Sequence, residues 1–121
     1  MKKLIPVYQP YLKGNEKKYV FDCIDSSWIS SKGKYIEKFE GSFSEYVDIK
    51  HCLTVSNGTV ALQLALLALG VGHGDEVIVP ALTYVATVNA IKHVGASPVF
   101  IDSKRETWQM DHDAIEDRIT P

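Results

Sequence analysis

The chain has 121 residues, of which 45% are hydrophobic and 23% are charged, and its formal net charge is -2 at pH 7. This length and composition are those of one folded domain or part of one, and they exclude an intrinsically disordered chain. The small negative charge provides no cluster of Lys and Arg for nucleic acid or for an anionic membrane, so neither partner is predicted.

The two cysteines, Cys23 and Cys52, are far apart and lack the C-x-x-C spacing of a zinc site. Each is expected to be a small apolar residue, and no metal site is predicted. The N-terminal residues hold too few apolar side chains before Pro6 for a signal peptide. No apolar run approaches the roughly 20 residues that span a bilayer. We therefore expect a cytoplasmic protein.

Residues 1–14 are expected to form an extended arm that reaches another subunit, because Pro6, Pro10 and Gly14 disfavour regular structure. Residues 15–48 are expected to form two helices, the first beginning at Asn15 as its N-cap. The apolar positions of the first helix are Tyr19, Val20, Cys23, Ile24 and Trp28. After the break WISSKG, those of the second are Tyr35, Ile36, Phe39, Phe43, Tyr46 and Val47.

Residues 49–121 alternate as β-α-β-α-β, with short apolar strands at 52–55, 76–80 and 97–102 and helices between them. Gly70 is suited to a left-handed cap at the end of the first of these helices, and Asp111 is expected to begin a last, weakly apolar helix. The alternation predicts an α/β fold with a mostly parallel sheet flanked by helices. Because such a sheet needs helices on both faces and further strands at its edges, we expect part of a larger domain.

The turn Ser56-Asn57-Gly58-Thr59 lies between the carboxyl end of the first predicted strand and the start of an apolar helix. The first amides of a helix lack internal partners and carry a partial positive charge, so a phosphate is stabilised there. Gly58 permits close approach of the backbone, and the Thr59 hydroxyl adds a donor. The alternative is that Ser56 or Asn57 only caps the helix and Gly58 only turns the chain.

Two known phosphate motifs are absent, since no G-x-x-x-x-G-K-[ST] occurs and no G-x-G-x-x-G follows a strand. Tyr84 follows the second predicted strand at the same carboxyl edge of the sheet as the turn. Its ring is placed to stack on a planar ligand whose phosphate the turn holds, or alternatively to pack in the core.

The run VSNGTVALQLALLALGVGHGDEVIVPALTYVATVNAIKHVGASPVFID, residues 55–102, resembles the front part of the DegT/DnrJ/EryC1/StrS family of pyridoxal-phosphate-dependent sugar aminotransferases. The arm IPVYQP, the stretch from Gly14 to Glu40 and the later ETWQMD are most similar to members that convert GDP-4-keto-6-deoxymannose to GDP-perosamine in O-antigen biosynthesis. The resemblance covers nearly all of the chain.

The resemblance implies the fold-type I, aspartate-aminotransferase-like fold, of which this chain is the N-terminal part of the large domain. It implies that Ser56, Asn57, Gly58 and Thr59 bind the phosphate of pyridoxal 5'-phosphate (PLP) and that Tyr84 stacks on its ring. The implied substrates are a nucleotide-linked 4-keto-6-deoxy sugar and an amine donor, typically glutamate. The implied assembly is a homodimer, in which Tyr8, Ser30 and Ser31 contribute to the substrate cleft or the subunit contact.

In this family the lysine that forms the Schiff base with PLP, and the Asp that partners the pyridine nitrogen, follow the region matched here. No catalytic residue is therefore assigned within the 121 residues, and the isolated chain is expected to be inactive. Lys50 and Lys92 are expected to be solvated. Two alternatives stay open, a non-catalytic phosphate-binding or interaction module that retains half of the fold, and a structural remnant without function.

Overall fold

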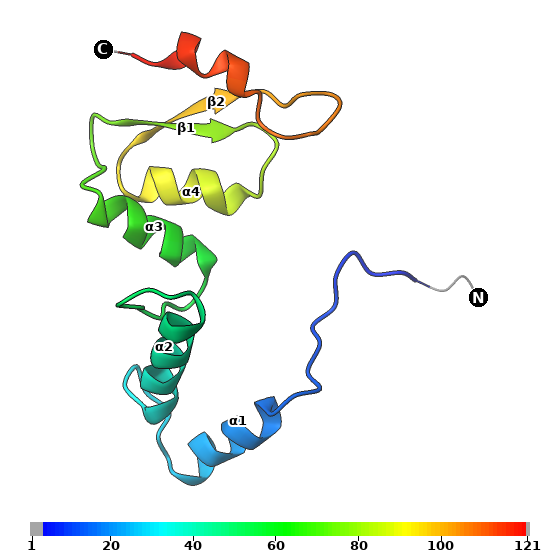
Figure 1. Ribbon diagram of the computed structural model, residues 1–121, viewed down its shortest axis with the longest axis vertical. Helices are drawn as coiled ribbons and strands as arrows, with labels where there is room; N and C mark the ends of the chain where they lie inside the picture. Colours follow the sequence, from blue (N-terminus) through cyan, green and yellow to red (C-terminus); the bar gives the residue numbers. More distant parts are fainter. Residues whose placement is uncertain (1–3, 121) are drawn as a thin grey trace. The chain divides into compact units, whose positions relative to one another are not determined.

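The computed structural model describes residues 4–120 (Figure 1). The chain divides into two compact units, Met1–Thr54 and Val55–Pro121, and each is considered by itself. The elements are helices and a parallel sheet, which confirms the predicted α/β class.

The first unit contains α1 (Glu16–Asp25) and α2 (Lys34–Tyr46), while residues 4–14 carry no helix or strand. Asn15 occupies the N-cap position of α1, but its side chain makes no capping hydrogen bond. The two helices are joined through Asp22, whose Oδ2 accepts from the Tyr35 hydroxyl at 2.8 Å and lies 2.5 Å from Lys34 Nζ. The rings of Tyr19 and Tyr35 add an aromatic contact, with their centroids 5.0 Å apart.

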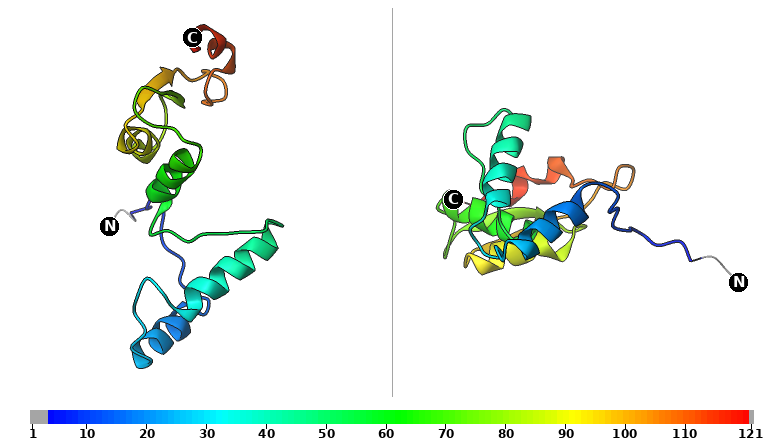
Figure 2. Two further views of the ribbon diagram at one scale, coloured as in Figure 1. Left: turned by 90° about the vertical axis from the view of Figure 1, so that its left-hand side faces the viewer. Right: turned by 90° about the horizontal axis from the view of Figure 1, so that it is seen from below.

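The second unit contains α3 (Gly58–Ala68), β1 (Glu76–Pro80), α4 (Val85–His93) and β2 (Ser97–Ile101). The strands pair in parallel from Glu76 opposite Ser97 to Pro80 opposite Ile101, as a β-α-β crossover through α4 requires. Helix α4 packs on both strands and α3 packs along α4, side by side in Figures 1 and 2. The core is built from Val79, Ile91 and Ala96.

The four α-helices of the described chain end in the same way, in a residue with positive φ followed by two backbone hydrogen bonds that close the last turn. The residues in this left-handed position are Ser27, Asp48, Gly70 and Gly95. Gly70 confirms the predicted cap, whereas Ser27 ends α1 earlier than the apolar spacing indicated. None of the described helices combines the length and apolar character needed to cross a bilayer.

The strand predicted at 52–55 is wrong, because within the described chain this segment pairs with no strand. In a sheet, the backbone N–H of Thr54 would donate to a carbonyl oxygen of a neighbouring strand. Here it donates to Oε1 of Glu40 at 2.7 Å. The α-helix that was predicted to begin at Asp111 is also wrong, because the helical turns there are of the 3-10 type. Asp111 Oδ1 does accept from the Asp113 N–H at 3.1 Å, but two short 3-10 turns follow, His112–Ala114 and Glu116–Arg118.

Candidate functional site

Asn57 is the N-cap of α3 and has an extended backbone. Its Oδ1 accepts from the Val60 N–H at 3.1 Å, and its carbonyl accepts from the Ala61 N–H at 3.1 Å. Its Nδ2 donates to Ser56 Oγ at 3.3 Å, which leaves the Ser56 hydroxyl free to donate its own proton. Asn57 therefore holds the first turn of the helix in place, as the capping alternative proposed.

Gly58 and Thr59 supply the remaining backbone donors of the turn. Among the described residues neither amide has a hydrogen-bond partner, and the Thr59 hydroxyl has none either. A Cβ built on Gly58 meets no atom within 4 Å, so a ligand can reach the backbone there. The first turn of α3 contains no acidic side chain that would repel an anion. Two unpartnered amides at the positive end of a helix dipole are a suitable site for a phosphate.

Tyr84 occupies the N-cap position of α4, four residues beyond Pro80 at the end of β1. Its side chain makes no capping bond and is 80% exposed, which excludes the core alternative within the described chain. The first turns of α3 and α4 both lie toward the side to which the arrowheads of β1 and β2 point (Figure 1). The amino ends of α3 and α4 thus lie on the side of the unit where ligands of open α/β sheets bind.

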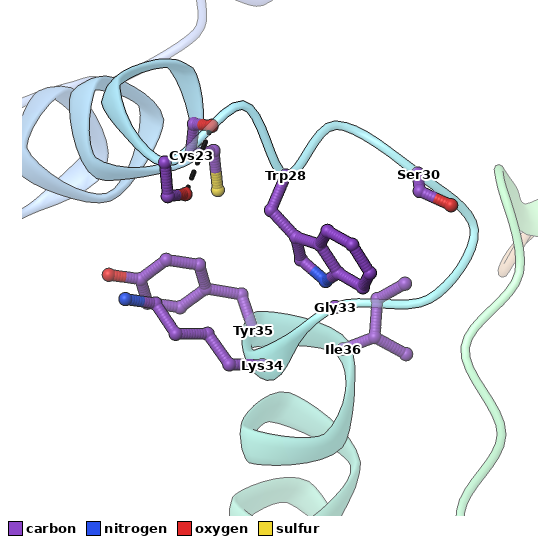
Figure 3. A pocket seen from close by; sticks show the side chains of 8 residues that line it. Cys23, Trp28, Ser30, Gly33, Lys34, Tyr35 and Ile36 are labelled. Atoms are coloured by element: carbon purple, nitrogen blue, oxygen red, sulfur yellow. Dashed lines mark hydrogen bonds between the residues drawn. The ribbon is translucent and has the colours of Figure 1, made fainter.

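The other three predicted residues belong to the unit Met1–Thr54. Tyr8 is exposed on the arm, and Ser31 is exposed on the loop between α1 and α2. Ser30 lines a pocket of about 420 Å³ together with Cys23, Trp28 and Gly33 (Figure 3). A Cβ on Gly33 would stand 2.8 Å from Trp28 Cδ1, so the indole fills the space that a side chain at 33 would need.

Glu40 is a feature that the sequence pattern did not indicate. One of its carboxylate oxygens, Oε1, accepts from both the N–H and the hydroxyl of Thr54, at 2.7 and 2.8 Å. Hydrogen bonds from the Thr54 N–H and then from its hydroxyl hold the pKa of Glu40 below its usual value. The two residues are 14 positions apart, and no local periodicity signals a contact at that separation.

The family model described as the DegT/DnrJ/EryC1/StrS aminotransferase family matches residues 10–121. The chain is 64% identical to the GDP-perosamine synthase of Escherichia coli O157:H7 over 118 residues, which are 98% of this chain and 32% of that protein. It is 56% identical to the GDP-perosamine synthase of Vibrio cholerae over 116 residues, 96% of this chain and 32% of that one.

A similar solved structure is the PLP form of Spr1654 from Streptococcus pneumoniae, with a TM-score of 0.86 and 40% identity over 96% of this chain and 29% of that one. The chain thus spans about a third of the length of the curated relatives it matches. The two proteins share their fold over this region, which is the N-terminal part of a fold-type I enzyme. The chain belongs to the DegT/DnrJ/EryC1/StrS aminotransferase family.

Proposed function

We propose that the turn Ser56–Thr59 and Tyr84 form the phosphate and ring part of a PLP site in a sugar aminotransferase. The observation that carries this proposal is the pair of unpartnered amides at Gly58 and Thr59, on a turn that a ligand can approach freely. Family membership supports it, as does the PLP form of a structure with the same fold.

Each residue has a distinct part in this proposal. The amides of Gly58 and Thr59 donate to phosphate oxygens, and the hydroxyls of Ser56 and Thr59 add side-chain donors. The Oδ1 of Asn57 does not bind a phosphate oxygen, because both atoms are acceptors; it accepts from the Val60 N–H instead. Tyr84 covers one face of the pyridine ring and excludes water from it. When bound, PLP supplies an electron sink for transfer of an amino group.

We further propose that the substrate is GDP-4-keto-6-deoxymannose, aminated at C4 to GDP-perosamine with glutamate as the amine donor. Two relatives at 64% and 56% identity that are named GDP-perosamine synthase support this choice. A cytoplasmic homodimer in which Tyr8, Ser30 and Ser31 serve the substrate cleft or the subunit contact belongs to the same proposal. The position of Ser30 on the wall of a pocket is in accord with that part.

The proposal is tested by titrating the chain with PLP, inorganic phosphate and pyridoxal, while the amide resonances of Gly58 and Thr59 are followed by NMR. Pyridoxal shares the ring and aldehyde of PLP but lacks the phosphate. We expect PLP and phosphate to shift the same two resonances and to compete with each other, and pyridoxal to leave them unchanged. Equal binding of PLP and pyridoxal, or shifts confined to other residues, would show that this turn does not hold the phosphate.

A further inference from the structure

Tyr84 begins helix α4 without a capping side chain. It occupies the N-cap position with an extended backbone, φ -69° and ψ 138°, and its side chain makes no capping hydrogen bond. Short polar side chains such as Ser, Thr, Asp and Asn are preferred there, because their oxygens accept from the first amides of the helix. A residue that breaks a local preference of this kind is expected at a functional site.

Thr87, in the first turn of α4, makes contacts on both sides of Tyr84. Its N–H donates to the carbonyl oxygen of Tyr84 at 3.0 Å. Its hydroxyl forms a hydrogen bond with the hydroxyl of Thr83, and the two oxygens are 3.1 Å apart. Thr87 therefore holds the residue that precedes Tyr84 as well as the carbonyl of Tyr84 itself.

Thr87 is in turn held by the packed part of the same unit. It is half-buried, and it lines a narrow cleft of about 200 Å³ between α3, β1 and α4 together with Leu62, Pro80 and Ala90. A β-branched side chain has few rotamers in a helix, so its hydroxyl is presented in a defined direction. The bond between Thr83 and Thr87 thus connects the exposed segment around Tyr84 to the core side of α4.

This connection has a consequence for the stacking of Tyr84 on a ligand. The backbone at Tyr84 sets the direction of its Cα–Cβ bond, and from there the position of the exposed ring. A ring on a loosely held backbone loses conformational freedom when it stacks, and this loss lowers the affinity. Holding the backbone beforehand reduces the loss. The gain concerns the ring of the ligand and not its phosphate.

We infer that Thr87 is a positioning residue for Tyr84, whose ring its hydroxyl helps to present to the plane of the cofactor by holding Thr83. This inference rests on the proposed function, in which Tyr84 covers the pyridine ring. Thr87 itself touches no cofactor atom in this arrangement. All three residues belong to the unit Val55–Pro121.

The variants that test this inference remove the hydroxyl bond from either side. Thr87→Val and Thr83→Val each delete one hydroxyl and keep the branched shape, whereas Thr87→Ser keeps the hydroxyl. Tyr84→Ala, alone and combined with Thr87→Val, shows whether Thr87 acts through the ring. Thr120→Val is the matched control, because it removes a 2.8 Å hydroxyl bond to Glu76 at the opposite, amino end of β1.

The measurements compare two ligands of the 121-residue chain. Pyridoxine 5'-phosphate has the ring and phosphate of PLP but an alcohol in place of the aldehyde, so it forms no lysine adducts. Inorganic phosphate has no ring. Without any ligand, hydrogen exchange of the Thr87 amide is compared between Thr83→Val and the original chain, since residue 87 is the same in both.

We expect Thr87→Val and Thr83→Val each to weaken binding of pyridoxine 5'-phosphate about two- to threefold and to leave the affinity for inorganic phosphate unchanged. The double variant should bind no more weakly than either single one, and Thr87→Val should have no further effect in the Tyr84→Ala background. Thr87→Ser and Thr120→Val should bind like the original chain. Exchange of the Thr87 amide should be faster in Thr83→Val.

Equal weakening of both ligands by Thr87→Val would show a general loss of structure and overturn the inference. Unchanged binding of pyridoxine 5'-phosphate, or the same loss with and without the Tyr84 ring, would overturn it as well. If Thr87→Val does not fold, the binding of Thr83→Val decides. An original chain that binds pyridoxine 5'-phosphate no better than inorganic phosphate counts against the proposed role of Tyr84 instead, and unchanged Thr87 exchange in Thr83→Val then refutes the positioning contact by itself.

Discussion

At Gly58 the missing side chain leaves room for a ligand, because a Cβ built there touches no atom of the described protein. Gly58→Ala should therefore fold normally and gain up to about 0.5 kcal/mol, since Ala is the better helix former. The same methyl group would stand where a phosphate oxygen approaches the backbone. We expect phosphate affinity to fall about tenfold, which is about 1.4 kcal/mol.

Gly41 provides the control for this experiment. It also has open space around a built Cβ, but it lies inside α2. Gly41→Ala should raise the free energy of unfolding by about 1 kcal/mol and leave phosphate binding unchanged. Thermal unfolding and a phosphate titration of both variants check the prediction. Equal phosphate affinities for the two variants would contradict the assignment of Gly58.

Asp22 makes the stability of the first unit depend on pH. Its hydrogen bond with Lys34, and then that with Tyr35, hold its pKa below the ordinary 3.8. A lowered pKa in the folded state means that the stabilisation is complete above the unfolded pKa and is lost as pH falls through the folded value. Asp22→Asn should therefore destabilise the protein at neutral pH and have progressively less effect below about pH 4. Urea unfolding across this range tests the prediction, and a pH-independent difference would refute it.

Some residues of the candidate site could be predicted from the sequence, and others could not. Gly58, Thr59 and Tyr84 could be proposed as site residues from the sequence, because each lies within four residues of the end of a predicted apolar strand. Of the two alternatives for the turn, capping is confirmed for Asn57, whereas phosphate binding by the next two amides, which are free of partners within the described chain, stays a prediction. The contact of Glu40 was not predictable, because it depends on tertiary packing between distant residues.

Among the elements, the helix ends differ in how well their residues suit the left-handed position. Ser27 has φ 57° and Gly95 has φ 87°, but only glycine adopts such angles without steric cost. Ser27→Gly should therefore stabilise the chain by about 0.5–1 kcal/mol, whereas Ser27→Ala should bring no gain. Gly95→Ala should destabilise it by about 1–2 kcal/mol through backbone strain. Chemical denaturation of the three variants measures these effects, and stabilisation by Gly95→Ala would contradict this account.

Helices and strands could be predicted where a regular pattern of apolar residues ran over a long segment. The apolar periodicity of α1 to α4 and the alternation around β1 and β2 gave their positions within a few residues. The segment Cys52–Val55 shows the limit of such patterns. Its composition favours a strand, but a strand exists only where a neighbour accepts its hydrogen bonds, and that neighbour is not signalled by the segment itself.

For the whole molecule, the distribution of lysines predicts how the isolated chain behaves with PLP. Lys104 follows β2 at the carboxyl edge, but its amine lies 2.6 Å from Asp113 Oδ2 and 3.5 Å from Asp111 Oδ1. Hydrogen bonding with Asp113 raises its pKa, so the amine stays protonated and a poor nucleophile. Lys92 lies in the last turn of α4, about 12 Å along the helix from Tyr84.

We therefore expect borohydride reduction of the chain with PLP to give scattered lysine adducts without one dominant site. Incubation with GDP-4-keto-6-deoxymannose, glutamate and PLP should yield no aminated sugar nucleotide. Peptide mapping by mass spectrometry and chromatography of the nucleotides are the measurements. A single dominant adduct together with product would show that these 121 residues are catalytically sufficient.

The arm that precedes α1 leaves its aromatic side chains open to solvent, with Tyr8 85% and Tyr11 76% exposed. Chymotrypsin cleaves after such residues when the backbone around them is accessible, as it is where no helix or strand shields it. A brief digest should clip the chain first after Tyr8 and Tyr11, leaving a trimmed species that still contains every helix and strand. Trimming of this kind would separate whatever the arm contributes from what the remaining polypeptide does alone.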